Sequence, residues 1–505
     1  MEHHSLYAGY SLYTVMPDAI CKSTPSVRFR DSVALTHTAL IDHYRHSPFE
    51  MDSLKNFISE CGEAKSAAGV EPVALVEAVT NTGTLLITAC NDFENATSKT
   101  PLGLEEPHVI QLPGTIRQCF SSSSSFHSFI LSGEGKLYAF GRNDRGQLGK
   151  QPKPLQVLST NLNILFHLNS LFSGTGDLVT YSYPVELPNI GLFPAGSKII
   201  KIATGRSHSL ILLESGDVYG CGANTQGQLG LGDSKVAIRD SLRFVKILSL
   251  VAIRDISCGY DHSIVCDRSG RLLTFGHPQY GQLGHGTDGS FIKDGGKGAA
   301  MQFRCIFSPR QIEKFVVKDS HGKLQTEVPA SEVNIRLVAA GKNHSVCVEE
   351  WENNGRNKVY SFGFGGYGRL GHNSGTDEFY PREITTFQSI VGGQQVTSEN
   401  FPQKQIHQIV AGSTYTMAIS KSKHLYFWGK LSNSQRGEAV MYPKMEMNLY
   451  GWNTRHCAGG SNSVFVAADA SCVAWGVPVA VRICLFRGFF LIPLCSLFHD
   501  SSSNL

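Results

Sequence analysis

The stretch from Ile199 to Gly230 reads IIKIATGRSHSLILLESGDVYGCGANTQGQLG, and it decides the fold. It holds short apolar runs at 200–203, 208–213 and 218–221, which glycine-containing turns separate. Runs of this length are too short for helices, so they predict strands. Three such strands joined by tight turns, with room for a fourth before the next copy, predict a small antiparallel sheet.

This unit recurs along the chain. The glycine after the first run is followed 17 residues later by another glycine in four copies, and a fifth copy has five extra residues. A Gly-Gln-Leu-Gly turn stands at 146–149, 227–230 and 281–284, and Gly-Arg-Leu-Gly stands at 368–371. Small sheets repeated at roughly 50 residues are typical of a β-propeller. Such a scaffold favours a surface for partners over a catalytic cleft.

Glycines, a histidine and a turn leucine mark the same places in each unit. The glycines allow tight turns with positive φ, and the leucine anchors the turn. We expect the aromatic residue before the late glycine to wedge between neighbouring sheets. The positions that we expect to shape the repeat are Gly205, His208, Gly227, Leu229, Gly259, His262, Gly281, Leu283, Gly341, His344, Gly368 and Leu370.

These repeats resemble the regulator of chromosome condensation family, and the match covers roughly residues 83–476. Two stretches, 360–372 and 278–292, resemble its mitotic, telophase-disc branch, and 311–328 and 442–444 also fit. The resemblance implies an all-β, seven-bladed β-propeller. It also implies binding of a small GTPase of the Rac or Ral type, with either guanine-nucleotide exchange or sequestration as the outcome.

The same resemblance implies a role in the cell cycle and in cytoskeleton organisation. The expected places are the nucleus and cytoplasm, and in mitosis the chromosome, centromere, spindle and midbody. Centromere, chromatin or microtubule-associated proteins are then further partners. The alternative is a chromatin-binding propeller without GTPase activity. The basic tail with which this branch usually begins is not seen in the sequence.

Composition gives no sign of catalysis or of a nucleic-acid footprint. The net charge is +3, and no run of five or more Lys or Arg occurs. The 13 cysteines form no Cys-x-x-Cys pair, which favours free thiols in a reducing compartment over a zinc site or a disulfide framework. No secretion signal is seen. We expect no cofactor, no metal, no catalytic residue and no small-molecule substrate.

Counting the pieces predicts how the ring is built. Six whole units lie within 67–476, and a late half stands alone at 83–91. Propellers often make one blade from both chain ends, so this half predicts an early half near the C-terminus. The pattern stops at Gly476, which predicts incomplete closure. Insertions are expected at 151–196 and 285–333.

Two segments lie outside the predicted propeller. Residues 1–66 form an N-terminal extension with a helix expected at 48–61, which a capping box at 47–50 would begin. Residues 477–505 form an apolar tail. Its uninterrupted apolar part, 488–498, has 11 residues, fewer than the roughly 20 that a spanning helix needs. We therefore expect no membrane span.

One long connection is the candidate partner-binding element, because binding residues collect on long loops of a rigid scaffold. The residues that we expect to contact a partner are Asp288, Phe291, Ile292, Lys293 and Arg304. An apolar pair flanked by charges suits an interface anchor with a polar rim. The alternative is an idle loop. A hairpin is expected further on, at 312–318 and 323–328.

The histidines at 127, 208, 262 and 344, each followed by serine, form no catalytic set, because each belongs to a different unit. We expect them to be structural and to bond nearby backbone. The Gly-x-Gly-Gly-x-Gly stretch at 363–368 superficially resembles a phosphate loop. It lacks the following Lys-Ser/Thr and falls on a repeat turn, so we expect no phosphate site there.

Overall fold

A computed structural model gives the fold of the 505-residue chain. The structure describes residues 108–476 except 113–115, 150–179, 188–192, 234–239, 248, 293–300, 351–356, 392–393, 398–404, 432–438, 450, 461–462 and 469–470. It also describes 74–79, 84–90, 482–485 and 491–493. The helix expected at 48–61 lies outside these residues.

Each of the six repeat units forms one antiparallel sheet, named here sheet 1 to sheet 6 in chain order. Sheets 1 to 3 contain β4 (Ile116–Phe120), β5 (His127–Ser132), β6 (Leu137–Arg142) and β7 (Thr180–Leu187); β8 (Ile199–Thr204), β9 (His208–Leu213), β10 (Val218–Gly222) and β11 (Ser241–Lys246); β12 (Ile253–Cys258), β13 (His262–Asp267), β14 (Leu272–Gly276) and β17 (Ile306–Gln311).

Sheets 4 to 6 follow the same order. They contain β20 (Ile335–Ala340), β21 (His344–Glu349), β22 (Val359–Gly363) and β23 (Glu378–Glu383); β26 (Ile406–Ala411), β27 (Tyr415–Ser420), β28 (Leu425–Gly429) and β29 (Val440–Met445); β30 (Thr454–Gly459), β31 (Ser463–Ala468), β32 (Ser471–Gly476), β33 (Arg482–Leu485) and β34 (Leu491–Pro493).

The remaining elements lie in or beside the connections. An N-terminal sheet contains β1 (Ala74–Val79), β2 (Thr84–Cys90) and β3 (His108–Gln111). Three hairpins are β15 (Ser290–Ile292) with β16 (Met301–Phe303), β18 (Lys314–Lys318) with β19 (Leu324–Pro329), and β24 (Gln388–Val391) with β25 (Gln394–Thr397). Short 3₁₀ turns span Ala330–Glu332, Gly366–Gly368 and Met447–Leu449.

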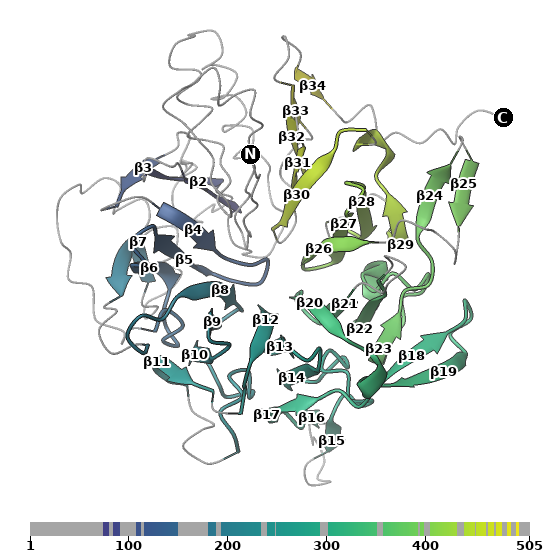
Figure 1. Cartoon of the computed structure of the whole chain (residues 1–505), viewed down its shortest axis with the longest axis horizontal. Helices are drawn as coiled ribbons and strands as arrows, with labels where there is room; N and C mark the ends of the chain where they lie inside the picture. The colour runs from purple at the N-terminus through teal and green to yellow at the C-terminus, as the bar shows by residue number, and fades with distance from the viewer. Residues whose placement is uncertain are drawn as a thin grey trace.

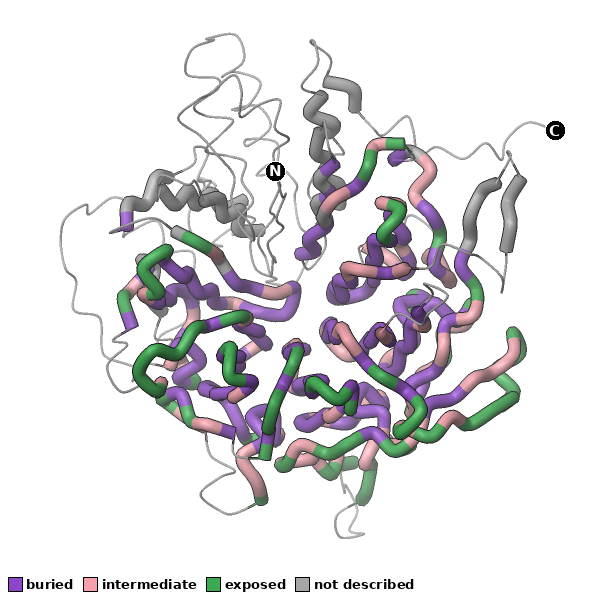
Figure 2. Tube along the Cα trace, in the orientation of Figure 1, coloured by how far each residue is buried: buried purple, intermediate pink, exposed green. Residues whose placement is uncertain are grey.

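The sheets are arranged radially, and the first strand of each of sheets 2 to 5 faces the centre (Figure 1). This is the propeller architecture that the repeat predicts, and the all-β fold is confirmed. The seven-blade count and the incomplete closure stay predictions. Burial follows the repeat, since β5, β9, β13, β21 and β27, the second strands of sheets 1 to 5, are buried throughout (Figure 2).

The chain ends of the ring differ from the sequence expectation. The strand of the half unit at 83–91 is β2, and it pairs with β1, the strand just before it in the chain. At the other end β33 pairs with β32, so sheet 6 continues past Gly476 into the range expected to be a tail. An edge strand leaves backbone groups unpaired, and the following segment satisfies them.

The insertion expected at 151–196 contains a strand of the propeller. β7 pairs with β6 as the outermost strand of sheet 1. Pro184 within β7 argues against a central strand, but the outer edge of a sheet needs no N–H there. The fourth strands of units 3, 4 and 5, which are β17, β23 and β29, carry a proline at the same place, at 309, 381 and 443. Proline is thus a further repeat signal, which marks the fourth strand of the unit.

The hairpin expected at 312–318 and 323–328 is confirmed as β18 and β19. It joins the edge of sheet 4 through a parallel contact between Val316 and Arg382. Arg382 also donates to the carbonyl of Asp319 at 2.9 Å and to Glu378 at 2.7 Å. Sheet 4 therefore has six strands, with β19 on its outer edge.

Neighbouring sheets are joined by a repeated three-group hydrogen-bond relay. His262 Nε2 lies 3.0 Å from the Ser345 hydroxyl of the next sheet, and that hydroxyl donates to the Gln282 carbonyl at 2.8 Å. The relay thus links the second strand of one sheet, the second strand of the next, and a Gly-Gln-Leu-Gly turn. The other copies are His127–Ser209–Gln147, His208–Ser263–Gln228 and His344–Thr416–Arg369.

The expected structural role of these histidines therefore uses a different hydrogen-bond partner from the one predicted. The partner is a side-chain hydroxyl of the next sheet rather than nearby backbone. In the fifth unit Tyr415 stands in place of histidine, and its hydroxyl donates to the Gly460 carbonyl at 2.7 Å. The relay is therefore a contact between units, which spacing within one unit does not reveal.

The aromatic wedge is confirmed for Phe275, Phe362 and Trp428. A Cβ placed on Gly230 would lie 3.0 Å from the ring of Phe275, which belongs to the next sheet. Phe362 lies in the same way against Gly284, and Trp428 lies against Gly371. The turn leucines Leu148, Leu229, Leu283 and Leu370 are fully buried. The flanking turn glycines have positive φ, for example 80° at Gly227.

Gly259 shows why the early glycine is required. A Cβ there would lie 2.1 Å from the His262 ring and 2.6 Å from the Gly341 carbonyl oxygen. We expect Gly259→Ala to lower the free energy of unfolding by roughly 3 kcal/mol, since both neighbours are held in place. Gly375→Ala is the matched control, because nothing lies within 4 Å of its Cβ position. Urea unfolding of both variants checks this, and equal stability would contradict it.

Candidate partner-binding surface

The candidate partner-binding loop is a two-stranded finger between β14 and β17. Ser290 pairs with Phe303, Phe291 with Gln302, and Ile292 with Met301. Its two strands carry exposed apolar side chains, with relative exposures of 37% at Phe291, 67% at Ile292 and 62% at Met301. Exposed large apolar side chains grouped together mark interaction sites more often than single ones do. This group is named here the β15–β16 finger.

The structure places the predicted contact residues as follows. Phe291 and Ile292 lie on β15, and the Arg304 guanidinium carbon lies 5.9 Å from the Phe291 ring centre. The Asp288 carboxylate accepts a hydrogen bond from the Ser290 N–H at 3.0 Å, so it shapes the entry of the finger. Lys293 lies outside the described residues. Met301 was missed, although pairing the two arms of the loop would have placed it opposite Ile292.

The base of the finger is fixed to the propeller. Arg304 N–H donates to the Gly289 carbonyl at 2.7 Å, and the Phe303 ring lies 5.4 Å from the His277 ring. The Cys305 thiol donates to the Gln226 side-chain oxygen of sheet 2 at 2.9 Å. Contacts from two sheets therefore hold the base of the finger. Binding of a partner then costs less conformational entropy than it would with a free loop.

The finger shares one end of the ring with the turns that join first and second strands, because antiparallel alternation brings those turns and the third-to-fourth connections to the same end. These turns contact one another around the axis. Arg206 N–H donates to the Tyr260 carbonyl, and Tyr260 N–H donates to the Lys342 carbonyl, both at 3.2 Å. Arg206 and Lys342 also stack on the Tyr260 ring at 4.8 and 5.0 Å.

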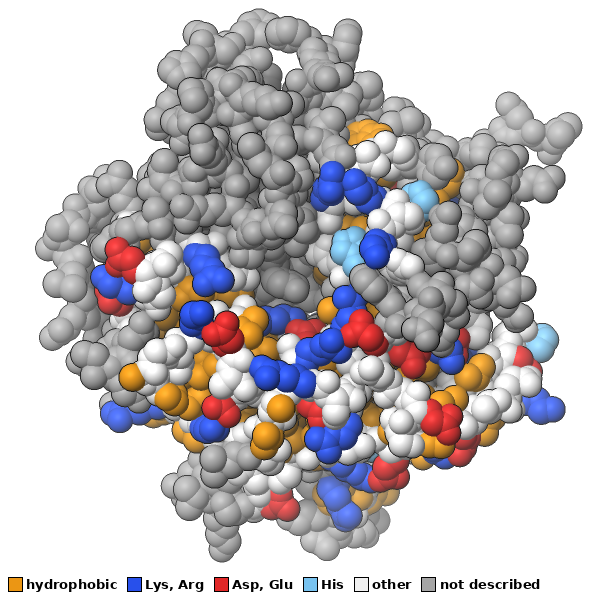
Figure 3. All heavy atoms as spheres, viewed as in Figure 1, with side chains coloured by type: hydrophobic (Ala, Val, Ile, Leu, Met, Phe, Trp, Pro, Cys, Tyr) orange, Lys and Arg blue, Asp and Glu red, His pale blue; other side chains and the backbone are white. Residues whose placement is uncertain are grey.

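Near the centre and in the lower half of the face that Figure 3 draws, the described Lys and Arg side chains lie among Asp and Glu. Many of these charges are paired, as Lys201 is with Asp255 at 2.6 Å and Arg254 with Glu350 at 2.7 Å. Mixed charge of this kind provides no broad basic stripe over the described residues of that part of the face.

The relay histidines are not suited to acid–base chemistry. Burial lowers the pKa of His127, His208 and His262 to about 3, and it lowers the pKa of His344 well below its ordinary value. Each is therefore neutral near pH 7 and serves as a hydrogen-bond partner. Within the described residues no three His, Cys, Asp or Glu side chains gather to hold a metal ion. No described helix is long and apolar enough to cross a membrane.

These features define a class: a repeat β-propeller with relay bonds between neighbouring sheets and an anchored finger with exposed apolar side chains. Comparison with known proteins gives the family. Residues 105–484 match the RCC1-like domain, which is most of the chain. The chain therefore belongs to the RCC1-like domain family, the regulator of chromosome condensation repeat family that the sequence resembles.

Individual relatives agree. The chain is 34% identical over 361 residues to the Protein RCC2 homolog of Xenopus laevis, covering 72% of this chain and 60% of that protein. It is 34% identical to human Protein RCC2, covering 72% and 58%. The match thus spans about 60% of these relatives' length.

A solved structure supports the fold. The crystal structure of Prp20p from Saccharomyces cerevisiae, described with its binding properties to Gsp1p and histones, superposes with a TM-score of 0.50. It shares 19% sequence identity and covers 76% of this chain and 78% of its own. At this identity the likeness shows the fold alone.

The buried histidines predict acid sensitivity. Their pKa values are lower in the folded protein than the ordinary 6.5, so the unfolded chain binds more protons between pH 6.5 and about 3. Stability is then full above pH 6.5 and falls as the pH drops, by up to about 1.4 kcal/mol per pH unit for each histidine. Urea unfolding between pH 7.5 and 5 measures this loss.

A histidine variant separates this effect from general acid unfolding. We expect His262→Gln to be less stable at pH 7.5 but to lose less stability on acidification, because glutamine does not titrate. His321→Gln, at an exposed turn, is the control and should keep the slope of the unchanged protein. An unchanged slope in His262→Gln would contradict the assignment.

Proposed function

We propose that this protein is a non-catalytic propeller that binds and regulates a small GTPase of the Rac or Ral type. Its setting is mitosis and the organisation of the centromere, spindle and cytoskeleton. Membership of the RCC1-like domain family and the similarity to RCC2 proteins support this proposal. Prp20p, which shares the fold, is described with its binding properties to Gsp1p and histones.

The observation that carries the proposal is the anchored β15–β16 finger with its exposed Phe291, Ile292 and Met301. Buried apolar anchors with polar surroundings dominate the energy of protein interfaces. Arg304, beside the Phe291 ring, supplies a charged group at the edge of these apolar side chains. The finger therefore inserts apolar side chains into the partner, and the ring keeps it in position.

Regulation of this kind needs no covalent step. A regulator that favours the nucleotide-free GTPase holds its switch loops away from the phosphates and Mg²⁺, and nucleotide exchange follows. A regulator that binds all nucleotide states of the GTPase equally well does not promote exchange and sequesters the GTPase instead. The finger serves either mode, so the state preference of binding decides between them.

The test is a binding assay with Rac- and Ral-type GTPases in nucleotide-free, GDP and GTP-analogue states. We expect Ile292→Asp to weaken binding at least roughly tenfold, because a desolvated carboxylate replaces an apolar anchor. Val251→Asp is the matched control, since Val251 is 68% exposed on a different connection.

Preference for the nucleotide-free state would indicate exchange, and equal binding would indicate sequestration. Binding that Ile292→Asp leaves unchanged would place the contact away from the finger. Absence of binding in all three states would contradict the GTPase proposal itself.

The second candidate is a chromatin-binding propeller, which the description of Prp20p as a histone-binding protein favours. If it is correct, the protein should be retained on nucleosomes or DNA at low salt, with a steep loss as salt rises. Retention should not depend on Ile292. No retention at low salt would rule this candidate out.

A further inference from the structure

The turn between the first two strands of sheet 1 differs from its counterparts. In units 2, 3 and 4 three residues lie between the first strand and the relay histidine, and the first is glycine, as in 205–207. In unit 1 six residues lie there, and they begin with five serines, Ser121–Ser125. This segment is named here the serine strap. Its extra length lets it reach beyond its own sheet.

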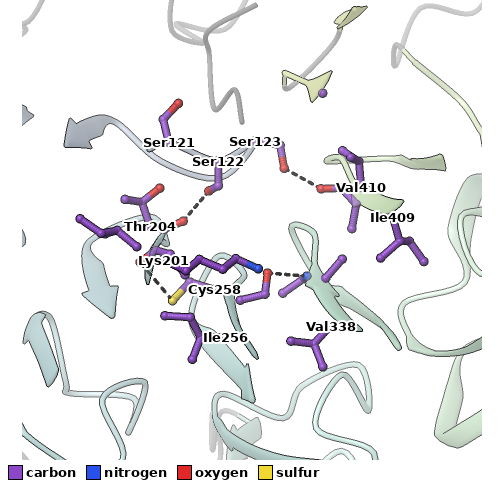
Figure 4. Close-up of a pocket in the computed structure, with 17 residues that line it drawn as sticks. Ser121, Ser122, Ser123, Lys201, Thr204, Ile256, Cys258, Val338, Ile409 and Val410 are labelled. Atoms are coloured by element: carbon purple, nitrogen blue, oxygen red, sulfur yellow. Dashed lines mark hydrogen bonds between the residues drawn. The ribbon is translucent and has the colours of Figure 1, made fainter. Parts of the chain in front are cut away.

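The strap extends into the central channel and contacts two other sheets there (Figure 4). The Ser122 hydroxyl donates to the Thr204 carbonyl at the end of β8, in the neighbouring sheet 2. The Ser123 hydroxyl donates to the Ala411 carbonyl at the end of β26 at 2.9 Å. These last two residues are 288 positions apart, and β26 belongs to sheet 5.

The strap is ordered by its own hydrogen bonds. The Ser125 hydroxyl donates to the His127 carbonyl at 3.0 Å, and Ser125 N–H donates to the Ser122 carbonyl at 3.2 Å. Ser123, Ser124 and Ser125 are at most 4% exposed. Serine supplies both the small volume and the donors that a buried turn in a narrow channel needs. These bonds hold the strap in a turn of its own.

Other hydrogen bonds around the channel join adjacent sheets. Ala340 N–H of sheet 4 donates to the Ser257 hydroxyl of sheet 3 at 3.0 Å, and the Gln408 amide of sheet 5 donates to the Cys457 carbonyl of sheet 6 at 2.9 Å. The Ser123 bond instead connects sheet 1 to sheet 5, across the channel and past sheet 6. It adds a link that the order of the sheets does not provide.

We propose that the serine strap is a clasp that holds the first repeat unit to the fifth across the channel. A ring built from one chain has its weakest seam between its first and last sheets, where no short connection exists. The clasp runs from sheet 1 across that seam to sheet 5, the neighbour of the last sheet, so separating sheets 1 and 5 requires the Ser123 bond to break. Opening of sheets 1 and 5 is therefore coupled.

The test replaces residues 121–126 with Gly-Arg-Ser, the turn of unit 2, which this scaffold already accepts. Hydrogen exchange is followed by mass spectrometry in the full chain. We expect amide exchange to rise roughly fivefold in β26 and β27 as well as in β4 and β5, as loss of one hydrogen bond implies for a shared opening step. Ser123→Ala should give the same distant effect without changing the turn length.

Ser422→Ala is the matched control, because Ser422 lies in an exposed turn of sheet 5 and bonds only within that turn. It should leave exchange in β4 and β5 unchanged. If Ser123→Ala speeds exchange only in sheet 1, the strap is an ordinary turn and the proposal is wrong. If the variant with the Gly-Arg-Ser turn does not fold, hydrogen exchange in the Ser123→Ala variant alone tests the proposal. Neither outcome depends on the identity of the partner.

Discussion

The relay from histidine to hydroxyl to carbonyl is the interaction on which the ring depends. Each copy buries an imidazole between two sheets and connects it to the turn that closes its own unit. A buried polar group without a partner is costly, so all three groups must be in register. This requirement fixes the distance between neighbouring sheets. It also explains why a glycine such as Gly259 must lie beside the imidazole ring of His262.

A ring built in this way leaves its connections free to vary. The third unit shows the result, since hairpins precede and follow β17, its outermost strand. One of them, β18–β19, joins sheet 4 through the parallel pairing of β18 with β23 and the hydrogen bond from Arg382 to the Asp319 carbonyl. The other, the β15–β16 finger, keeps the apolar side chains of Phe291, Ile292 and Met301 exposed. The repeat units thus supply the scaffold, and the connections supply exposed surfaces.

The centre of the ring holds a contact that the repeat pattern does not contain. Unit 1 lacks the early glycine and carries serines instead, so its turn is longer and rich in hydroxyl donors. The relay histidine His127 is retained directly after it and still bonds Ser209. Departure from the repeat at one turn therefore leaves the contact between neighbouring sheets intact and adds a second contact across the channel.

The sequence by itself determined the repeat unit, its strands, the turn residues and the family, because each follows from local spacing and from the backbone freedom of glycine. It also located the finger by the length of its connection. Only the tertiary structure decided the partners of the histidines, the pairing of β1 with β2, and the place of β33 beside β32. These contacts join residues far apart in the chain, and spacing within one unit carries no information about them.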